Sequence, residues 1–434
     1  MQAVRYRPNC SLTNDRKEST GRTIIVGAGI GGLTAALQLH RRGIEVAVYE
    51  QVSEIKPLGV GINLLPHGAG ELIGLGLGDA LAATGIETRE IQYRTRFGQL
   101  IYADPCGLAS GAPFPQYSIH RGHLQFLLLE ALRREAGDVV RSDHRLETFD
   151  QTATGVTAQF ISGTDPAQTT TATGDILIGA DGIHSAVRAA LHPNQPPVSY
   201  EGVMMWRGAH EQSPFLDGRT MVIAGNHDVK LVTYPISSEA AKRGKSLVNW
   251  VAEVRFDTPR PLNPGDWRRE GSREFISRFH EFGLDFLDLP ALFAATETVF
   301  EYPMIDREPL DRWTFDRVTL LGDAAHPMYP IGANGASQAI LDGGVLGNCL
   351  TEHGPLDGLT AYEAARREKT NAVVLRNRKS GPEAVLDLAD ARVKSPADRI
   401  EDLISQTELE QLTTDYRRLA GYDAESLKRR AAEQ

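Results

Sequence analysis

The stretch RTIIVGAGIGGLTAALQLHRRGIEVAVYE, residues 22–50, decides the fold. A short β-branched run leads into a glycine turn, then a helical stretch rich in leucine and alanine, then a second apolar run that ends at Glu50. This order predicts a strand, a helix and a parallel strand. Such a βαβ unit places the chain in the α/β class, with a Rossmann-like domain at its N-terminal end.

The glycines of this stretch form a dinucleotide-binding fingerprint. Gly27, Gly29 and Gly32 match G-x-G-x-x-G, where the first permits a tight turn, the second lets backbone approach a pyrophosphate and the third lets helix pack on strand. The phosphates are expected at the helix N-terminus. Glu50, 18 residues after Gly32, is placed to bind a ribose diol. FAD and NAD both satisfy this pattern, and a ligand-free glycine turn is the structural alternative.

Two later segments each place a carboxylate after a predicted strand. Asp181 stands in GADGIHSAVR, and Asp323 in LLGDAAHPMYPIGANGASQAILDG, where a loop containing Gly332 leads into an apolar helix. Asp323 can hold a polyol hydroxyl, although a helix N-cap is the simpler explanation. The N–H groups around Ala336 and Ser337 can face the electron-rich pyrimidine edge of a flavin, which favours FAD over NAD.

The three motifs, in this order and at strand ends, resemble those of the single-component FAD-dependent aromatic hydroxylases over residues 22–375. The segments SIHRGHLQ and GVGINLLPHG resemble most the phenazine and salicylate hydroxylase branch. The resemblance implies a Rossmann-like FAD-binding domain of the p-hydroxybenzoate hydroxylase type. It also implies an interleaved antiparallel-sheet substrate domain and a helical C-terminal tail.

The resemblance also assigns individual residues. Arg121 would touch the FAD linker, Asn63 would lie near the isoalloxazine, Leu146 would flank the adenine, and Pro330 would border the site where oxygen reacts. Asp181 would serve FAD and NAD(P)H positioning together. From the residues alone, Arg121 is equally a surface helix residue. The family form G-Q-G-x-N is replaced here by GANGAS, which leaves backbone contacts in place but removes an asparagine side chain.

The implied reaction needs non-covalent FAD and NADH or NADPH. The nicotinamide cofactor is expected to bind transiently, because no second fingerprint with its own acidic residue appears in the sequence. The resemblance implies that O₂ forms a C4a-hydroperoxide on the reduced flavin, which hydroxylates an aromatic or heteroaromatic, carboxylated or phenolic small molecule, with or without loss of the carboxylate. The ring system, the position of attack and the choice of NADH or NADPH are left open.

Candidate substrate residues come from strand-like segments of the second domain. In GVMMWRGAH, Trp206 and His210 share one face by period two and Arg207 lies on the other, so one of these sets can face a pocket. His227 lies in a GNHD turn, where exposure is the simple explanation. Tyr234, beside a proline, is either a packed strand aromatic or a pocket residue. For Arg207 a structural salt bridge is the alternative, and His326 in the third motif is also open to a structural role.

Domain boundaries follow from these segments. The polar residues 1–21 are expected to be a disordered lead-in. The FAD-binding domain is expected over 22–85, 116–195 and 301–358, the substrate domain over 86–115 and 196–300, and charged helices without distinctive chemistry over 359–434. Within these domains we expect one helix near 66–83 and another around 272–283.

Composition excludes several partners. The chain of 434 residues carries 46 Lys and Arg against 56 Asp and Glu, a net charge of −10, without a basic block to follow a phosphate backbone. No run of about 18 apolar residues predicts a membrane span. Cys10, Cys106 and Cys349 lie far apart, which disfavours a disulfide framework or a metal site and fits the cytoplasm. A monomer or a homodimer is expected.

Other flavoprotein classes fit less well. A flavin halogenase needs a W-x-W-x-I-P pattern that Trp206, Trp250, Trp267 and Trp313 do not form, and a flavin-disulfide reductase needs a cysteine pair. The altered GANGAS segment keeps one alternative open, a flavoprotein ligand sensor or an effector-stimulated NAD(P)H oxidase without oxygen insertion.

Overall fold

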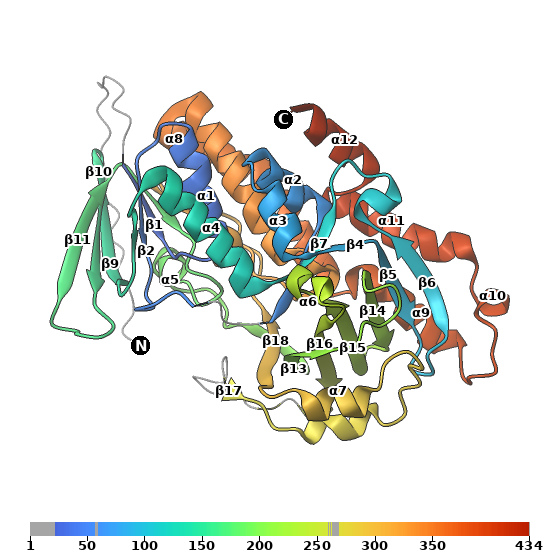
Figure 1. Ribbon diagram of the computed structural model, residues 1–434. Coiled ribbons are helices and arrows are strands. Elements are labelled where there is room, and N and C mark those ends of the chain that lie inside the picture. The colour runs from blue at the N-terminus through green and yellow to red at the C-terminus, as the bar shows by residue number, and fades with distance from the viewer. Residues whose placement is uncertain (1–21, 57–59, 259, 261, 263–268, 434) are drawn as a thin grey trace.

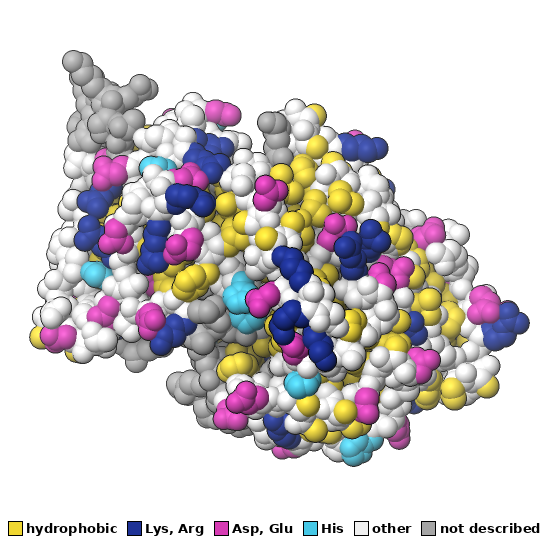
Figure 2. Space-filling model, in the orientation of Figure 1, with side chains coloured by type: hydrophobic (Ala, Val, Ile, Leu, Met, Phe, Trp, Pro, Cys, Tyr) yellow, Lys and Arg dark blue, Asp and Glu magenta, His cyan; other side chains and the backbone are white. Residues whose placement is uncertain are grey.

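The computed structural model describes residues 22–433 except 57–59, 259, 261 and 263–268 (Figure 1). The expected lead-in over 1–21 therefore lies outside the described residues. Within the described part, no helix is long and apolar enough to cross a bilayer. Acidic and basic side chains are interspersed on the face shown in Figure 2.

The βαβ unit belongs to a five-stranded sheet in which every neighbouring pair is parallel. Its order is β19-β12-β1-β2-β8. The strands are β1 (Thr23–Val26), β2 (Val46–Tyr49), β8 (Val140–Arg141), β12 (Ile176–Gly179) and β19 (Val318–Leu320). The four residues of β1, β2 and β12 are all buried, as expected for a parallel sheet covered on both faces.

Two layers cover this sheet. The helices on one face are α1 (Ile30–Arg41), α4 (Arg121–Ala136) and α8 (Gly335–Asn377), and the short α5 (Ala186–Leu191) follows β12. The three-stranded sheet β11-β10-β9 lies on the other side (Figure 1). Its strands are β9 (Arg145–Thr152), β10 (Gly155–Ile161) and β11 (Thr169–Gly174).

A second, eight-stranded sheet has the order β17-β18-β13-β16-β15-β14-β5-β6. Its strands are β5 (Glu90–Arg94), β6 (Leu100–Pro105), β13 (Ser199–Gln212), β14 (Thr220–Gly225), β15 (Val229–Pro235), β16 (Ser246–Arg255), β17 (Arg269–Glu270) and β18 (Phe300–Asp306). All pairs are antiparallel except β14 with β5, which are parallel. One face buries Trp206, Trp250 and Phe275 under α7 (Leu289–Ala295), and the opposite face borders a cavity.

A small antiparallel sheet, β3-β7-β4, joins the two large ones. It comprises β3 (Gly61–Leu64), β4 (Ile86–Thr88) and β7 (Gln116–His120). The helices α2 (Pro66–Gly74) and α3 (Gly78–Thr84) follow β3, and α6 (Ser238–Lys242) follows β15. The single helix expected near 66–83 is therefore two, because Gly76 takes φ of 63° and interrupts it.

The structure divides the chain differently from the expected boundaries at three places. Strand β18, expected in the FAD-binding domain, pairs with β13 in the eight-stranded sheet. Strand β4, expected in the substrate domain, pairs with β7. The expected tail start at 359 falls inside α8, which kinks at Gly354. The helix expected around 272–283 is a short 3₁₀ turn over Glu274–Phe279.

Most of the C-terminal helices pack on the cavity face of the eight-stranded sheet and beside β6, whereas the last one packs against α2 (Figure 1). They are α9 (Ala384–Arg392), α10 (Ile400–Leu403), α11 (Gln406–Ala420) and α12 (Ala424–Glu433). Val385, Leu386 and Leu409 share one apolar cluster with Tyr93 and Ile223 of the sheet. The tail is therefore part of the substrate side of the molecule.

Candidate active site

One cavity of about 370 Å³ lies between the Rossmann-like domain and the eight-stranded sheet. The first domain contributes the glycine turn after β1 and the loop between β19 and α8. The second contributes a row of side chains from six neighbouring strands. The cavity thus joins all three predicted motifs to the segments expected to bind substrate.

Two helix N-termini face this cavity. Gly29, Ile30 and Gly31 at the start of α1 line it, and so do Gly335 and Ala336 at the start of α8. Neither first turn carries an acidic residue, and neither N-cap side chain bonds the helix. The N–H groups of a first helical turn lack partners within the helix, so both ends favour negative charge.

The three fingerprint glycines meet different surroundings. A Cβ on Gly27 would lie 2.4 Å from the Ala180 carbonyl oxygen, and one on Gly32 would lie 2.1 Å from the Gly27 carbonyl oxygen. A Cβ on Gly29 would meet no atom within 4 Å. Gly27 and Gly32 are therefore required by packing, whereas Gly29 leaves open space in front of the helix.

Glu50 lies beside this turn at the end of β2. Its carboxylate accepts hydrogen bonds from the backbone N–H of Ala28 at 2.8 Å and of Val52 at 3.0 Å. It therefore holds the glycine turn, and lone pairs of the two carboxylate oxygens remain for a ribose hydroxyl. The side-chain amide of Gln125, on α4, also donates to the Ala28 carbonyl at 2.7 Å.

The two motif aspartates differ in their surroundings. Asp181 accepts hydrogen bonds from the Ser185 hydroxyl and from the N–H of Ala186 at 2.7 Å, at the start of α5. Burial raises the pKa of Asp181 and these bonds oppose the rise. Asp323 lines the cavity and is exposed to it, although it sits deep among protein atoms, and this confinement raises its pKa against the effect of His326 and Arg121.

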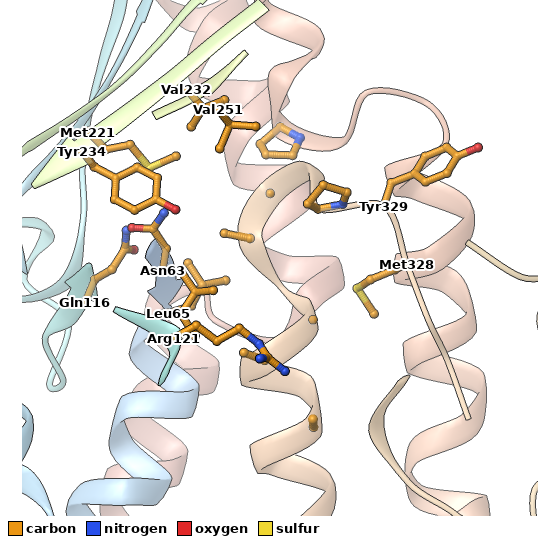
Figure 3. Close-up of a pocket in the computed structure, with 18 of the residues that line it drawn as sticks. Asn63, Leu65, Gln116, Arg121, Met221, Val232, Tyr234, Val251, Met328 and Tyr329 are labelled. Carbon is orange, nitrogen blue, oxygen red and sulfur yellow. The ribbon is translucent and has the colours of Figure 1, made fainter. Parts of the chain in front are cut away.

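The residues assigned by resemblance fall into two groups. Asn63 and Arg121 line the cavity, and Figure 3 shows them on the same side of it as Leu65. The Asn63 side chain is buried and accepts a hydrogen bond from Ser118. Leu146 does not line the cavity, because it is buried in β9 within the apolar core of the first domain.

The predicted cofactor residues in the loop before α8 and in its first turn also fall into those that line the cavity and one that does not. Pro330, Gly332 and Ala336 line the cavity. The Ser337 side chain is fully buried and its hydroxyl accepts a hydrogen bond from the N–H of Leu65 at 3.0 Å, so it faces α2 instead. Gly332 has φ of 68°, and a Cβ there would lie 2.4 Å from the Tyr416 hydroxyl.

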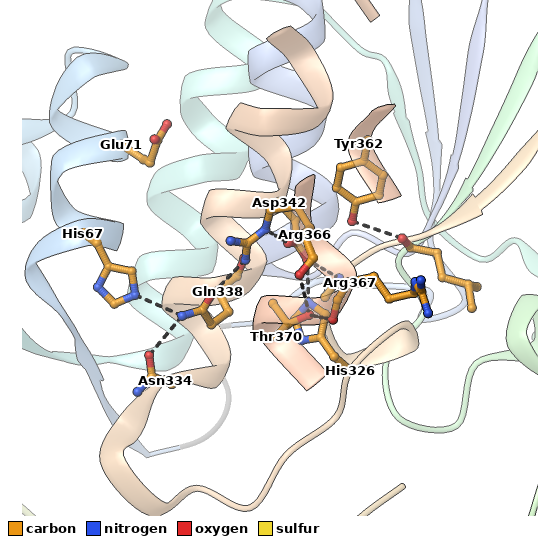
Figure 4. Close-up of polar contacts among 12 residues, drawn as sticks. His67, Glu71, His326, Asn334, Gln338, Asp342, Tyr362, Arg366, Arg367 and Thr370 are labelled. Atoms are coloured by element: carbon orange, nitrogen blue, oxygen red, sulfur yellow. Dashed lines mark hydrogen bonds and ion pairs between the residues drawn. The ribbon is translucent and has the colours of Figure 1, made fainter. Parts of the chain in front are cut away.

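A buried polar network holds the start of α8 from behind (Figure 4). Asp342 accepts hydrogen bonds from His326 at 2.6 Å and from Arg366 at 2.7 Å. Burial alone raises the pKa of Asp342, but these two partners lower it to about 2. Arg366 also donates to Gln338, whose amide contacts Asn334. His326 thus has a structural role in the third motif.

The cavity side of the eight-stranded sheet is a continuous wall. Residues two apart on a strand point to the same face, and this spacing recurs on five of six neighbouring strands. We name these residues the sheet wall: Met205, Arg207, Val251, Glu253, Val232, Tyr234, Met221, Ile223, Ile91, Tyr93 and Asp104.

Two of the four residues predicted to contact substrate lie on the sheet wall, and two do not. Arg207 and Tyr234 line the cavity, whereas His210 and His227 do not. The Arg207 guanidinium donates to the Gly61 carbonyl at 2.7 Å, and its positive charge acts on Tyr234. Burial raises the pKa of Tyr234, and Arg207 opposes the rise. His227 is exposed on its turn and contacts Arg255.

Several cavity residues had no signal at the sequence level. On the sheet wall, Glu253 pairs with the buried Lys230 at 2.8 Å, and Lys230 also pairs with Glu383 from the tail. Burial raises the pKa of Glu253. Tail residues Thr413, Arg417 and Tyr422 line the cavity as well, so the expectation of a tail without distinctive chemistry is wrong. Strand alternation, as in GVMMWRGAH, was the signal that pointed to the wall.

These residues fit FAD. Gly29 leaves open space at one helix N-terminus, where a pyrophosphate needs close backbone approach. A Cβ on Gly335 would approach no atom closer than 3.9 Å, so the second N-terminus is also open to a flat ring. Glu50, Arg121 and Asp323 supply the polar groups around these two openings.

Comparison with known proteins identifies the family. A model described as FAD binding domain matches residues 21–377. The phenazine 1,6-dicarboxylic acid hydroxylase of Lysobacter antibioticus is 46% identical over 360 residues, which cover 82% of this chain and 88% of that protein. This chain belongs to the FAD-dependent aromatic hydroxylases. The FAD-dependent urate hydroxylase of Klebsiella pneumoniae is 32% identical to this hydroxylase over 369 residues, covering 82% and 89% of the two chains.

Solved structures agree with the hydroxylase fold. Klebsiella pneumoniae HpxO, solved with FAD and uric acid, is 25% identical with a TM-score of 0.67 and covers 95% of this chain and 96% of its own. A salicylate hydroxylase substrate complex is 21% identical with a TM-score of 0.71 and covers 94% and 97%. The Rossmann-like domain, the sheet domain and the helical C-terminal region are confirmed as this family's fold.

Proposed function

We propose that this hydroxylase uses FAD, NAD(P)H and O₂ to hydroxylate a fused-ring aromatic carboxylic acid of the phenazine type. One observation carries the proposal: two helix N-termini suited to FAD face the sheet wall across one cavity. The Lysobacter antibioticus relative, which is named for a phenazine dicarboxylic acid, supports the ring class. NADH and NADPH remain equal candidates as reductant.

When bound and reduced by NAD(P)H, FAD would activate O₂, from which the inserted oxygen atom comes. The protein's part is to orient the ring and exclude water. Met221, Val232 and Val251 present an apolar surface to the cavity (Figure 3). An aromatic ring that packs on these side chains displaces water from the reacting face. Pro330 lines the same cavity.

We assign hydrogen bonding to the substrate to Tyr234 and its positioning to Arg207. The Tyr234 O–H can donate to an oxygen of the substrate, and the positive charge of Arg207 acts on the same side chain. Arg207 also holds the Gly61 carbonyl, so it ties the sheet wall to the strand that carries Asn63. Tyr234 and Asn63 approach each other in the close-up (Figure 3).

The test is turnover by the purified, FAD-loaded protein with NADH or NADPH in air. Phenazine-1,6-dicarboxylic acid, phenazine-1-carboxylic acid and salicylic acid serve as substrates. Mass spectrometry under ¹⁸O₂ is expected to find one labelled oxygen in a phenazine product. Measurement of CO₂ in the same reaction determines whether the oxygen replaces a carboxylate. NAD(P)H oxidation that yields only hydrogen peroxide with every acid would refute the proposal and favour the oxidase alternative.

A further inference from the structure

The C-terminal segment completes the substrate side of the cavity. Pro382, Glu383, Thr413, Arg417 and Tyr422 line it, and all lie beyond residue 377, where the match to the FAD binding domain model ends. These residues therefore belong to the part of the chain in which substrate preference can vary without altering the FAD-binding motifs.

Arg417 is the cation that this segment brings to the cavity. It lies on α11, where Thr413 is one turn away on the same face. Its Nη2 donates to the Asp104 carboxylate and to the Pro105 carbonyl at 3.1 Å. The Arg417 side chain is 24% exposed and the Asp104 side chain 6%. Asp104 thus fixes the guanidinium and balances its charge in a half-buried position.

Two nitrogens of this guanidinium remain available as donors. Within the part of the chain that the structure describes, Nε and Nη1 of Arg417 make no hydrogen bond. Both edges of an arginine that bind a carboxylate with two parallel bonds include Nη2, so Nε or Nη1 can each give a substrate carboxylate one charge-assisted hydrogen bond. The neighbouring Tyr422, whose ring stacks on His67 at 5.3 Å, forms a flat surface beside it.

Arg417 lies far along the sheet wall from the Tyr234–Arg207 pair. Asp104 is on β6, and three strand spacings separate β6 from β15, which carries Tyr234. At about 4.8 Å per spacing this is roughly 14 Å between strands, and five spacings to β13 and Arg207 are roughly 24 Å. A single-ring acid that contacts Tyr234 does not extend to Arg417, whereas a fused-ring acid with a second acidic group does.

We infer that Arg417 binds a carboxylate at the end of the substrate remote from the reacting carbon, and that the segment 382–422 thereby selects elongated diacids. The inference rests on the proposed function, because it takes the reacting end to be at Tyr234. Arg417 acts as a specificity residue, and Asp104 competes with the substrate carboxylate for it.

The experiment measures equilibrium binding to the FAD-loaded protein without NAD(P)H. The probes are phenazine-1,6-dicarboxylic acid and unsubstituted phenazine. Their binding is detected by the change that they cause in the absorption spectrum of the flavin. Arg417→Gln is expected to weaken diacid binding about 10- to 100-fold, the loss expected for a charge-assisted hydrogen bond, and to leave phenazine binding unchanged. Arg418→Gln is the matched control, because that neighbouring side chain is 70% exposed and does not line the cavity.

The variant Asp104→Asn distinguishes binding of a substrate carboxylate by Arg417 from a purely structural Arg417–Asp104 ion pair. Removal of the competing charge is expected to tighten diacid binding. If the ion pair were only structural, its loss would weaken the binding of both probes. Equal weakening of both probes in Arg417→Gln, unchanged diacid binding in that variant, or weaker diacid binding in Asp104→Asn would each overturn the inference. Because no turnover is needed, wild-type protein that binds the diacid without hydroxylating it would refute only the proposed function.

Discussion

Replacement of Gly29 by alanine is expected to weaken FAD binding while leaving the apoprotein folded. Gly29 has φ of −73° and ψ of −180°, an extended conformation that alanine adopts without strain. The added Cβ meets no protein atom within 4 Å. It enters the open space at the N-terminus of α1, where the pyrophosphate is expected to approach the backbone.

The size of the effect follows from the bonds that the methyl group displaces. A hydrogen bond to a charged group contributes about 1.5–3 kcal/mol, so the loss of one such bond raises the Kd for FAD about 10- to 100-fold. Gly32→Ala provides the contrast. Its Cβ would lie 2.1 Å from the Gly27 carbonyl oxygen, and such overpacking costs about 1–3 kcal/mol of folding free energy or more.

Both variants are assayed as apoprotein. Titration with FAD, followed by quenching of flavin fluorescence, gives the Kd, and urea unfolding gives the stability. The expected pattern is weak binding with wild-type stability for Gly29→Ala, and reduced stability for Gly32→Ala. Wild-type FAD affinity in Gly29→Ala, or a loss of stability equal to that of Gly32→Ala, would refute the reasoning.

Three further predictions concern other parts of the site. Asp342 has a pKa lowered to about 2, so its contribution to stability is present above its unfolded pKa of about 4 and is lost as pH falls through 2. Between pH 5 and 2, the free energy of unfolding should fall by about 2 kcal/mol more in wild type than in Asp342→Asn, and equal slopes in urea titrations would contradict this. Tyr234→Phe should lower kcat/KM for hydroxylation about tenfold with unchanged FAD content, because one hydrogen bond to the substrate is lost. An unchanged kcat/KM would show that Tyr234 does not bond the substrate. His227→Gln should leave steady-state kinetics unchanged, because His227 is exposed outside the cavity.

Much of the FAD side could be predicted from local sequence. Gly27, Gly29 and Gly32 act within one strand–turn–helix, so their spacing already states which backbone groups must come close. Asp323 and Ala336 likewise stand before and after one loop and line the same cavity. Ser337 and Leu146 do not line it, because the direction of a side chain at a helix start or on a sheet depends on what packs against it.

The substrate side could be predicted only in part. Period two in GVMMWRGAH placed Arg207 and His210 on opposite faces, and this alternation is intrinsic to a strand. Which face borders the cavity was decided by Trp206, which packs with Phe275 at 5.1 Å on the other side. His210 lies on the same face of the strand as Trp206, so it does not belong to the sheet wall.

By itself, the sequence determined the α/β class, the FAD-binding motifs and the hydroxylase family, because each depends on residues that are near one another in the chain. The tertiary structure alone decided the substrate wall and the role of the tail. Asp104 and Arg417 are 313 residues apart, and they meet because the C-terminal helices pack on a sheet whose strands pair in an order that the chain does not follow. Pairing between distant strands depends on the burial of a whole face, so no local spacing encodes it.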